Sequence, residues 1–176
     1  MRAEQIYMPR TLTELMRVNG YYNATSFSGC CGSIDVVHVK WSNCPTGDYN
    51  HAKGKEMFPS LGFQCITDYN HRILSIYGPP FGSRNDMDIV KTDDNVHAMW
   101  KNWLFRNAEW EHHAHNGHVQ KTCDMYLISD NGYFCWPMTN CPFTWANNAS
   151  PKGYFSMNLE SVWKDVECTF GILKKR

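Results

Sequence analysis

Asp35 interrupts an apolar, β-rich run at residues 32–39, and this one acid restricts what the chain can fold into. Side chains alternate along a strand, so Ser33 and Val37 share a face with Asp35. A carboxylate in such a run costs free energy unless an ion pair, backbone donors or a metal ion compensates it. The run therefore predicts a sheet strand whose acid is either a buried, paired residue or a ligand.

Two further acids lie in settings unlike that of Asp35. Asp130 follows the apolar run 125–129 and precedes a turn signal, so it is either a ligand beyond a strand end or a plain turn residue. Glu167 lies in a helical pattern, roughly 80° from the centre of the apolar stripe, where it either borders the sheet or pairs with solvent or lysine. If the three acids converge, they suit divalent metal and two-metal phosphodiester chemistry.

The other patterns predict a single α/β domain with a mixed sheet. A capping box at Thr11 and Glu14 opens a short helix that ends near Gly20. Asn85 or Asp86 caps a second helix. The histidine-rich tract 111–118 predicts a loop or an insertion. The expected strands are 33–39, 61–67, 72–77 and 125–129, the first three as a meander, and the later helices are 95–105 and 158–174.

Composition excludes several classes of protein. The 17 basic and 17 acidic residues balance, so bulk charge does not indicate a nucleic-acid binder, although the basic residues 174–176 are a local patch. No apolar run is long enough for a membrane span, and the N-terminus lacks the apolar core of a signal peptide. We expect the eight cysteines to be reduced, and without a Cys-x-x-Cys pair they do not predict zinc.

Four blocks of sequence resemble the PIF/Harbinger-type DDE transposases, in the order that this family has them. They are GCCGSIDVVH at 29–38, FGSRND at 81–86, SDNGY at 129–133 and KDVECTFGILK at 164–174. Together they span about four fifths of the chain. One block alone would be weak evidence, whereas four in order make the resemblance specific.

This resemblance implies a ribonuclease H-like fold whose C-terminal helix carries the third acid. It implies that Asp35, Asp130 and Glu167 are the catalytic residues and bind two ions of Mg²⁺ or Mn²⁺, which favour oxygen ligands. Asp86 and His38 are secondary candidates, because Asp86 also suits a helix cap and His38 points away from Asp35 in a regular strand. The implied activity is that of a DNA endonuclease and strand transferase in the nucleus or cytoplasm.

The chain departs from a complete transposase at both ends. We expect residues 1–28 to be a helical lead-in, too short for a helix-turn-helix DNA-binding region, and residues 29–176 to be the catalytic core, truncated at its C-terminus. Binding to transposon ends and target DNA should then be weak, with a separate DNA-binding protein or a second copy as partners. The alternative is a domesticated or decayed protein that binds DNA or a protein without catalysis.

Overall fold

A five-stranded mixed sheet forms the centre of the molecule in the computed structural model, which describes residues 6–113, 116–133 and 136–175. The strand order is β3-β2-β1-β6-β7. β1 (Cys30–Lys40), β2 (Ser60–Thr67) and β3 (Ile73–Tyr77) form the predicted antiparallel meander, while β6 (Tyr126–Ile128) and β7 (Thr139–Asn140) add in parallel beside β1. The chain is thus mixed α/β, and the ribonuclease H-like fold stays a prediction.

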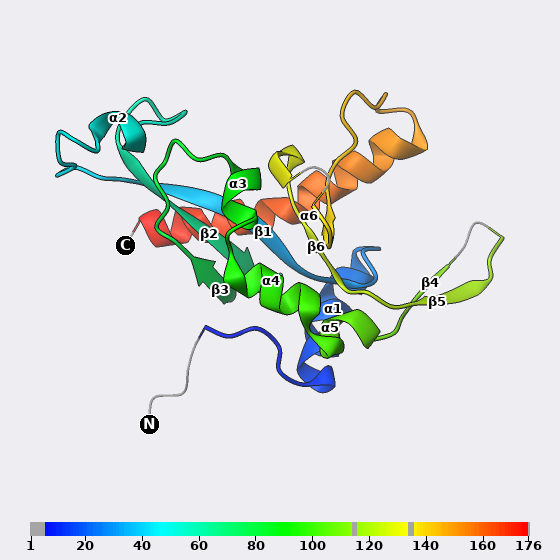
Figure 1. The fold of residues 1–176 in the computed structure, drawn as a ribbon. Helices are drawn as coiled ribbons and strands as arrows, with labels where there is room; N and C mark the ends of the chain where they lie inside the picture. The colour runs from blue at the N-terminus through cyan, green and yellow to red at the C-terminus, as the bar shows by residue number, and fades with distance from the viewer. Residues whose placement is uncertain (1–5, 114–115, 134–135, 176) are drawn as a thin grey trace.

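Helices cover both faces of this sheet (Figure 1). Adjacent side chains of β1 point to opposite faces. Val37 packs with Val166 and Phe170 of α6 (Pro151–Lys174), whereas Val36 joins a cluster with Ile89 of α3 (Asp86–Val90) and with α4 (Asp94–Lys101). The molecule therefore has three layers, and Asp35 shares the parity of Val37 on the α6 side.

Helix α1 (Leu12–Ala24) is longer than predicted and belongs to the core. Thr11 is its N-cap, and its side chain accepts a bond of 3.2 Å from the Glu14 amide, as the capping box predicts. The predicted end near Gly20 is wrong, because Tyr22 is fully buried and its hydroxyl lies 3.2 Å from that of Ser33. Burial of this aromatic side chain extends the helix by one turn past the glycine.

Two other helix boundaries also differ from the prediction. Ser150 caps α6 and Pro151 is its first residue, so the helix starts seven residues earlier than expected and the preceding irregular stretch is shorter. The single helix predicted at 95–105 is two helices, α4 and α5 (Trp103–Asn107). Asn102 separates them because its side chain accepts a hydrogen bond of 2.8 Å from the Leu104 amide and so starts a new helix.

Residues 111–113 of the histidine-rich tract lie in one strand of a β-hairpin, so the prediction of a loop is wrong for them, whereas residues 116–118 lie outside the strands, as a loop does. β4 (Trp110–His113) pairs antiparallel with β5 (Val119–Thr122), and the hairpin projects away from the central sheet (Figure 1). Gly117, at φ 79°, lies in the connecting turn, while His115 is outside the described residues. Helix α2 (Tyr49–Ala52) lies in the connection between β1 and β2, and a short 3-10 helix, η1 (Asn131–Tyr133), follows β6. Within the described ranges, no helix has the length and apolar character needed to cross a membrane.

Candidate active site

The pairing of β1 with β6 brings Asp35 and Asp130 to neighbouring positions. Ser33 is the partner of Ile128 in this parallel ladder. The two strands run in the same direction. Asp35 and Asp130 lie two residues beyond Ser33 and Ile128, and therefore on the same face. β6 ends at Ile128, which places Asp130 just beyond the carboxyl end of the strand, where ligands of open α/β sheets gather.

Helix α6 brings the third acid to the same face of the sheet. Trp163 donates its indole N–H to the Ile34 carbonyl at 3.1 Å, and Val166 is fully buried against the sheet, so the helix is fixed over β1. Glu167 follows Val166 and is exposed. Asp35, Asp130 and Glu167 together line a hollow of about 420 Å³. The three predicted site residues therefore meet at one place, although they come from separate segments.

The surroundings of Asp35 and Asp130 disfavour the ionised form of both carboxyl groups. Burial is the main cause that raises the pKa of Asp35 to about 7; the charges of Asp130 and Asp86 add to the shift, while a backbone hydrogen bond at Val36 and the charge of Lys55 oppose it. Burial is also the main cause that raises the pKa of Asp130, with Asp86 and Glu167 adding to it. Such shifts are typical of functional carboxylates. A divalent cation would remove the penalty for both.

The carboxylate groups of the hollow are suitable ligands for Mg²⁺, but their side chains lie too far apart to hold one ion as they stand. Carboxylate oxygens are the hard ligands that this ion prefers. Among the residues that the structure describes, however, no three His, Cys, Asp or Glu side chains lie close enough to hold one ion. Glu167 is an exposed helical side chain that can change rotamer. The site thus offers the right atoms, and closure around an ion requires side-chain movement.

Asp86 lies beside Asp130 and is not a helix cap. The cap of α3 is Asn85, whose side chain accepts a bond of 2.8 Å from the Asp88 amide. A Cβ added to Gly132 would lie 2.7 Å from Asp86 Oδ2 and 2.9 Å from Asp130 Oδ1, so both carboxylates press on this glycine. Asp130 also accepts a bond of 2.9 Å from the Gly132 amide, as expected of a turn residue. Asp86 is therefore a fourth acid next to the site.

His38 is a packed histidine. The ladder between β1 and β2 is regular from Asp35 to His38, so no bulge turns the ring toward the acids. The ring is buried, and its Nδ1 lies 3.3 Å from the Ser60 hydroxyl. His38 touches the rim of the hollow, but its secondary role stays a prediction.

Further residues line the hollow beside the predicted acids. Lys55 and Glu56 come from the connection between β1 and β2, and Trp163, Gly171 and Lys174 come from α6. Of these five, Lys174 was singled out from the sequence as part of the basic patch 174–176. The helical residues could have been found from their spacing, because positions four and seven after Glu167 share its face. Nothing local in residues 43–55, which contain Pro45, Gly47 and Gly54 and are typical of turns, points to Lys55.

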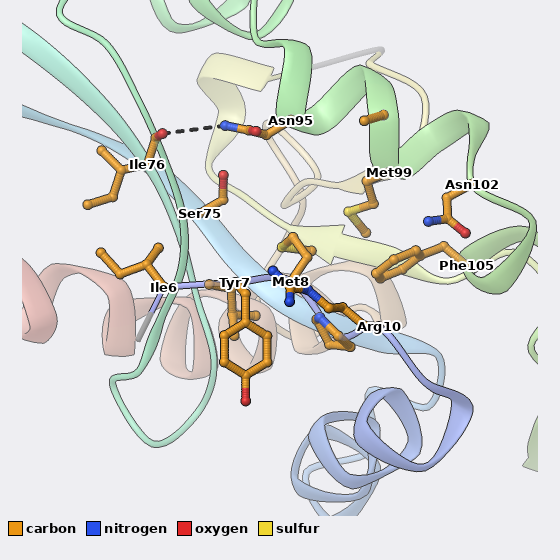
Figure 2. Close-up of a pocket in the computed structure, with 13 residues that line it drawn as sticks. Ile6, Tyr7, Met8, Arg10, Ser75, Ile76, Asn95, Met99, Asn102 and Phe105 are labelled. Atoms are coloured by element: carbon orange, nitrogen blue, oxygen red, sulfur yellow. Dashed lines mark hydrogen bonds between the residues drawn. The ribbon is translucent and has the colours of Figure 1, made fainter. Parts of the chain in front are cut away.

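A second hollow, of about 530 Å³, lies under the N-terminal segment and is shown in Figure 2. Tyr7, Met8 and Arg10 form one wall, and β3 and α4 form the other. Asn95 of α4 donates to the Ile76 carbonyl across it, at 3.4 Å. It is larger than the acid-lined hollow, but its lining includes no carboxylate, so it offers none of the ligands that metal-assisted hydrolysis requires.

Comparison with known proteins identifies the family. No curated protein and no solved structure gives a significant match to this chain. A family model described as plant transposon protein matches residues 5–176, which include all four sequence blocks and all three acids. The chain therefore belongs to the plant transposon protein family.

Proposed function

We propose that this transposon-derived chain is a metal-dependent DNA endonuclease and strand-transferase core of the PIF/Harbinger type, with a ribonuclease H-like fold. One observation carries the proposal: Asp35, Asp130 and Glu167 line a single hollow although separate segments supply them. The sheet order and the parallel placement of β6 beside β1 are compatible with the proposed fold.

In this proposal the protein positions oxygen ligands around the reacting phosphate. Asp35 lies on β1, Asp130 lies just beyond the end of the neighbouring strand β6, and Glu167 lines the same hollow from α6. Two bound Mg²⁺ or Mn²⁺ ions would activate the attacking oxygen and stabilise the leaving oxygen of a phosphodiester. Because the pKa of Asp35 is about 7, this ligand is only half ionised near pH 7 in the protein without metal. Activity should therefore rise with pH through neutrality.

The proposed substrate is duplex DNA, held weakly and without sequence preference by this chain alone. Phosphate contacts give affinity and base contacts give specificity. With a net charge of zero, affinity should be low and should fall steeply with salt. A separate DNA-binding protein or a second copy would supply recognition, and the nucleus is the proposed location.

A plasmid-nicking assay tests the proposal. The wild-type protein should convert supercoiled plasmid to open circles with Mg²⁺ or Mn²⁺ and not with EDTA. Asp130→Asn should abolish nicking while circular dichroism shows an intact fold, since the change keeps the shape of the side chain and removes its charge. Nicking that survives EDTA or this substitution would refute the mechanism.

A second function, binding of DNA or a protein without catalysis, has one observation in its favour. The described residues contain no ready-made group of three metal ligands. A decayed or domesticated protein has no need to keep one. If folded wild-type protein fails to nick plasmid in the presence of every divalent metal ion tested, at each pH from 6 to 9, the result would favour this second function.

A further inference from the structure

The turn that carries Lys55 is fixed to the body of the protein by backbone contacts. Gly54 accepts a bond of 3.1 Å from the Met57 amide, which makes Lys55 and Glu56 the two central residues of a tight turn. A Cβ at Gly54 would overlap the Gly82 carbonyl oxygen, so the two glycine backbones are in direct contact. The turn thus packs on the connection between β3 and α3.

Further contacts join Gly82 and Ser83 to the chain on both sides of the Lys55 turn. The Ser83 hydroxyl donates to the His51 carbonyl at 2.5 Å, and Gly82 donates to the Ser60 carbonyl at 2.9 Å. The FGSRND block therefore contributes more than Asp86, because its Gly82 and Ser83 hold the Lys55 turn in place. Lys55 is exposed, lines the acid hollow, and takes part in none of the ion pairs found among the described residues.

The opposite wall of the hollow is one face of α6, and this face has no side chain at Gly171. Gly171 and Lys174 follow Glu167 along this face. A Cβ at Gly171 would meet nothing within 4 Å, so close packing inside the protein does not require glycine there. Glycine is unfavourable inside a helix. An unpacked helical glycine between an acid and a lysine suits the close approach of a ligand.

We propose that Lys55 and Lys174 bind the phosphates of a DNA backbone that crosses the acid hollow, with Gly171 as the space through which the backbone passes. The proposal rests on the proposed function and adds the side chains that hold the substrate. The acid hollow repels a polyanion, so cations on both walls are needed to bring a phosphate to the carboxylates. Both lysines are positioning residues, and neither is a metal ligand.

The test measures binding of a fluorescent 20-base-pair duplex in Ca²⁺, as anisotropy over a range of salt. Each phosphate contact contributes about 0.9 to the slope of log K against log salt. Lys55→Gln and Lys174→Gln should each lower affinity roughly five- to tenfold at 0.1 M salt and reduce the slope by about 1. Lys101→Gln, an exposed lysine on α4 across the sheet, removes the same charge and should leave both values unchanged.

Glycine variants separate ligand contact from fold stability. Gly171→Leu should raise the melting temperature, because leucine favours a helix, and yet weaken DNA binding at least tenfold. Gly20→Leu is the matched control, since a Cβ at this exposed helical glycine also meets nothing within 4 Å. It should stabilise the protein without changing DNA affinity.

The outcomes distinguish this inference from the proposed function. Wild-type protein with no salt-dependent DNA binding, lysine variants that bind like Lys101→Gln, or a Gly171→Leu variant with unchanged affinity would overturn the phosphate contacts. Loss of affinity in these variants without any nicking by the wild type would support the contacts and reject the nuclease. In an active enzyme, the lysine variants should raise KM more than they lower kcat.

Discussion

The acid hollow and the histidine hairpin both carry side chains that can bind metal, and they are built in opposite ways. Asp35 lies on the central strand β1, Asp130 lies just beyond the end of the adjacent strand β6, and burial raises the pKa of both. His113 and His118 lie exposed on a two-stranded arm away from that sheet. The local density of ligand residues would favour the histidine hairpin as the metal site, whereas topology and burial favour the acid hollow.

This contrast shows that placement in the fold matters more than the local density of ligand residues. An exposed side chain pays no desolvation free energy in the metal-free protein. Metal binding therefore relieves no such penalty there. A buried carboxylate is destabilised in the free protein, and the folded structure retains that cost because other contacts outweigh it. Variants in the two regions should therefore differ in activity, stability and metal response.

The largest expected effect is that of Asp35→Asn on cleavage. The substitution removes a charged ligand of similar size, and the loss of several kcal/mol of metal-mediated stabilisation corresponds to at least about a thousandfold in rate. Initial rates of plasmid nicking in Mg²⁺ measure it. A rate within tenfold of the wild type would show that Asp35 is a structural acid.

The same substitution should increase stability without metal. The pKa of Asp35 is about 7 in the folded protein and 3.8 as a free side chain, so its favourable contribution is complete below pH 3.8 and is lost as the pH rises through 7. Above pH 7, Asp35→Asn should be more stable by roughly 2–4 kcal/mol. Urea unfolding in EDTA should show this difference growing from pH 4 to pH 7 and then levelling off.

Two further measurements check that prediction: the effect of Mg²⁺ on the melting temperature, and the same substitution at an exposed aspartate. Mg²⁺ should raise the melting temperature of the wild type and not that of Asp35→Asn, because a ligand stabilises only the state that binds it. Asp88→Asn, on the surface of α3, should show neither the pH-dependent gain nor the loss of the Mg²⁺ response. A stability difference independent of pH would contradict the ionisation of Asp35 as its cause.

Gly132→Ala should reduce cleavage by about a hundredfold, as a displacement of roughly 1 Å in an active site does. Its Cβ would press on the carboxylates of Asp86 and Asp130, so Asp130 must move. Gly47→Ala is the control, since a Cβ at that position meets nothing within 4 Å. Nicking rates measure both variants, and an unchanged rate in Gly132→Ala would show that the position of Asp130 does not matter.

The smallest effect should come from the hairpin. Replacing its histidines with serine should leave Mg²⁺-dependent cleavage within a few-fold, because imidazole suits this ion poorly. The replaced residues are His112, His113, His115 and His118. A loss as deep as that of Asp35→Asn would show that the metal site is misplaced in this account.

The sequence predicted those parts of the structure that local patterns determine. Alternation around Asp35 placed it on one face of a strand, and the β-like runs at 33–39, 61–67 and 72–77 form the expected meander. The histidine hairpin was missed because its polar strands lack the apolar alternation of a half-buried sheet. The start of α6 was misplaced because prolines and polar residues near 151 read as loop, although proline is favoured at a helix start.

The candidate site was predictable to a lesser degree. The three acids were named from their sequence blocks, and pairing of Ser33 with Ile128 accounts for the meeting of two of them. The place of Asp86 was not predictable, since Asn85 and Asp86 are equally good caps by sequence. Lys55 was not predictable either, because its position depends on contact between Gly54 and Gly82, two glycines distant in sequence.

Anomalous diffraction from crystals of the wild-type protein soaked in Mn²⁺ tests the central claim most directly. The account predicts a peak in the acid hollow, about 2.0–2.3 Å from carboxylate oxygens of Asp35 and Asp130, with Glu167 turned toward it. Asp35→Asn crystals should lose that peak. A wild-type structure with manganese bound only at the histidine hairpin, or with the carboxyl group of any of the three acids more than about 10 Å from the other two, would contradict the account.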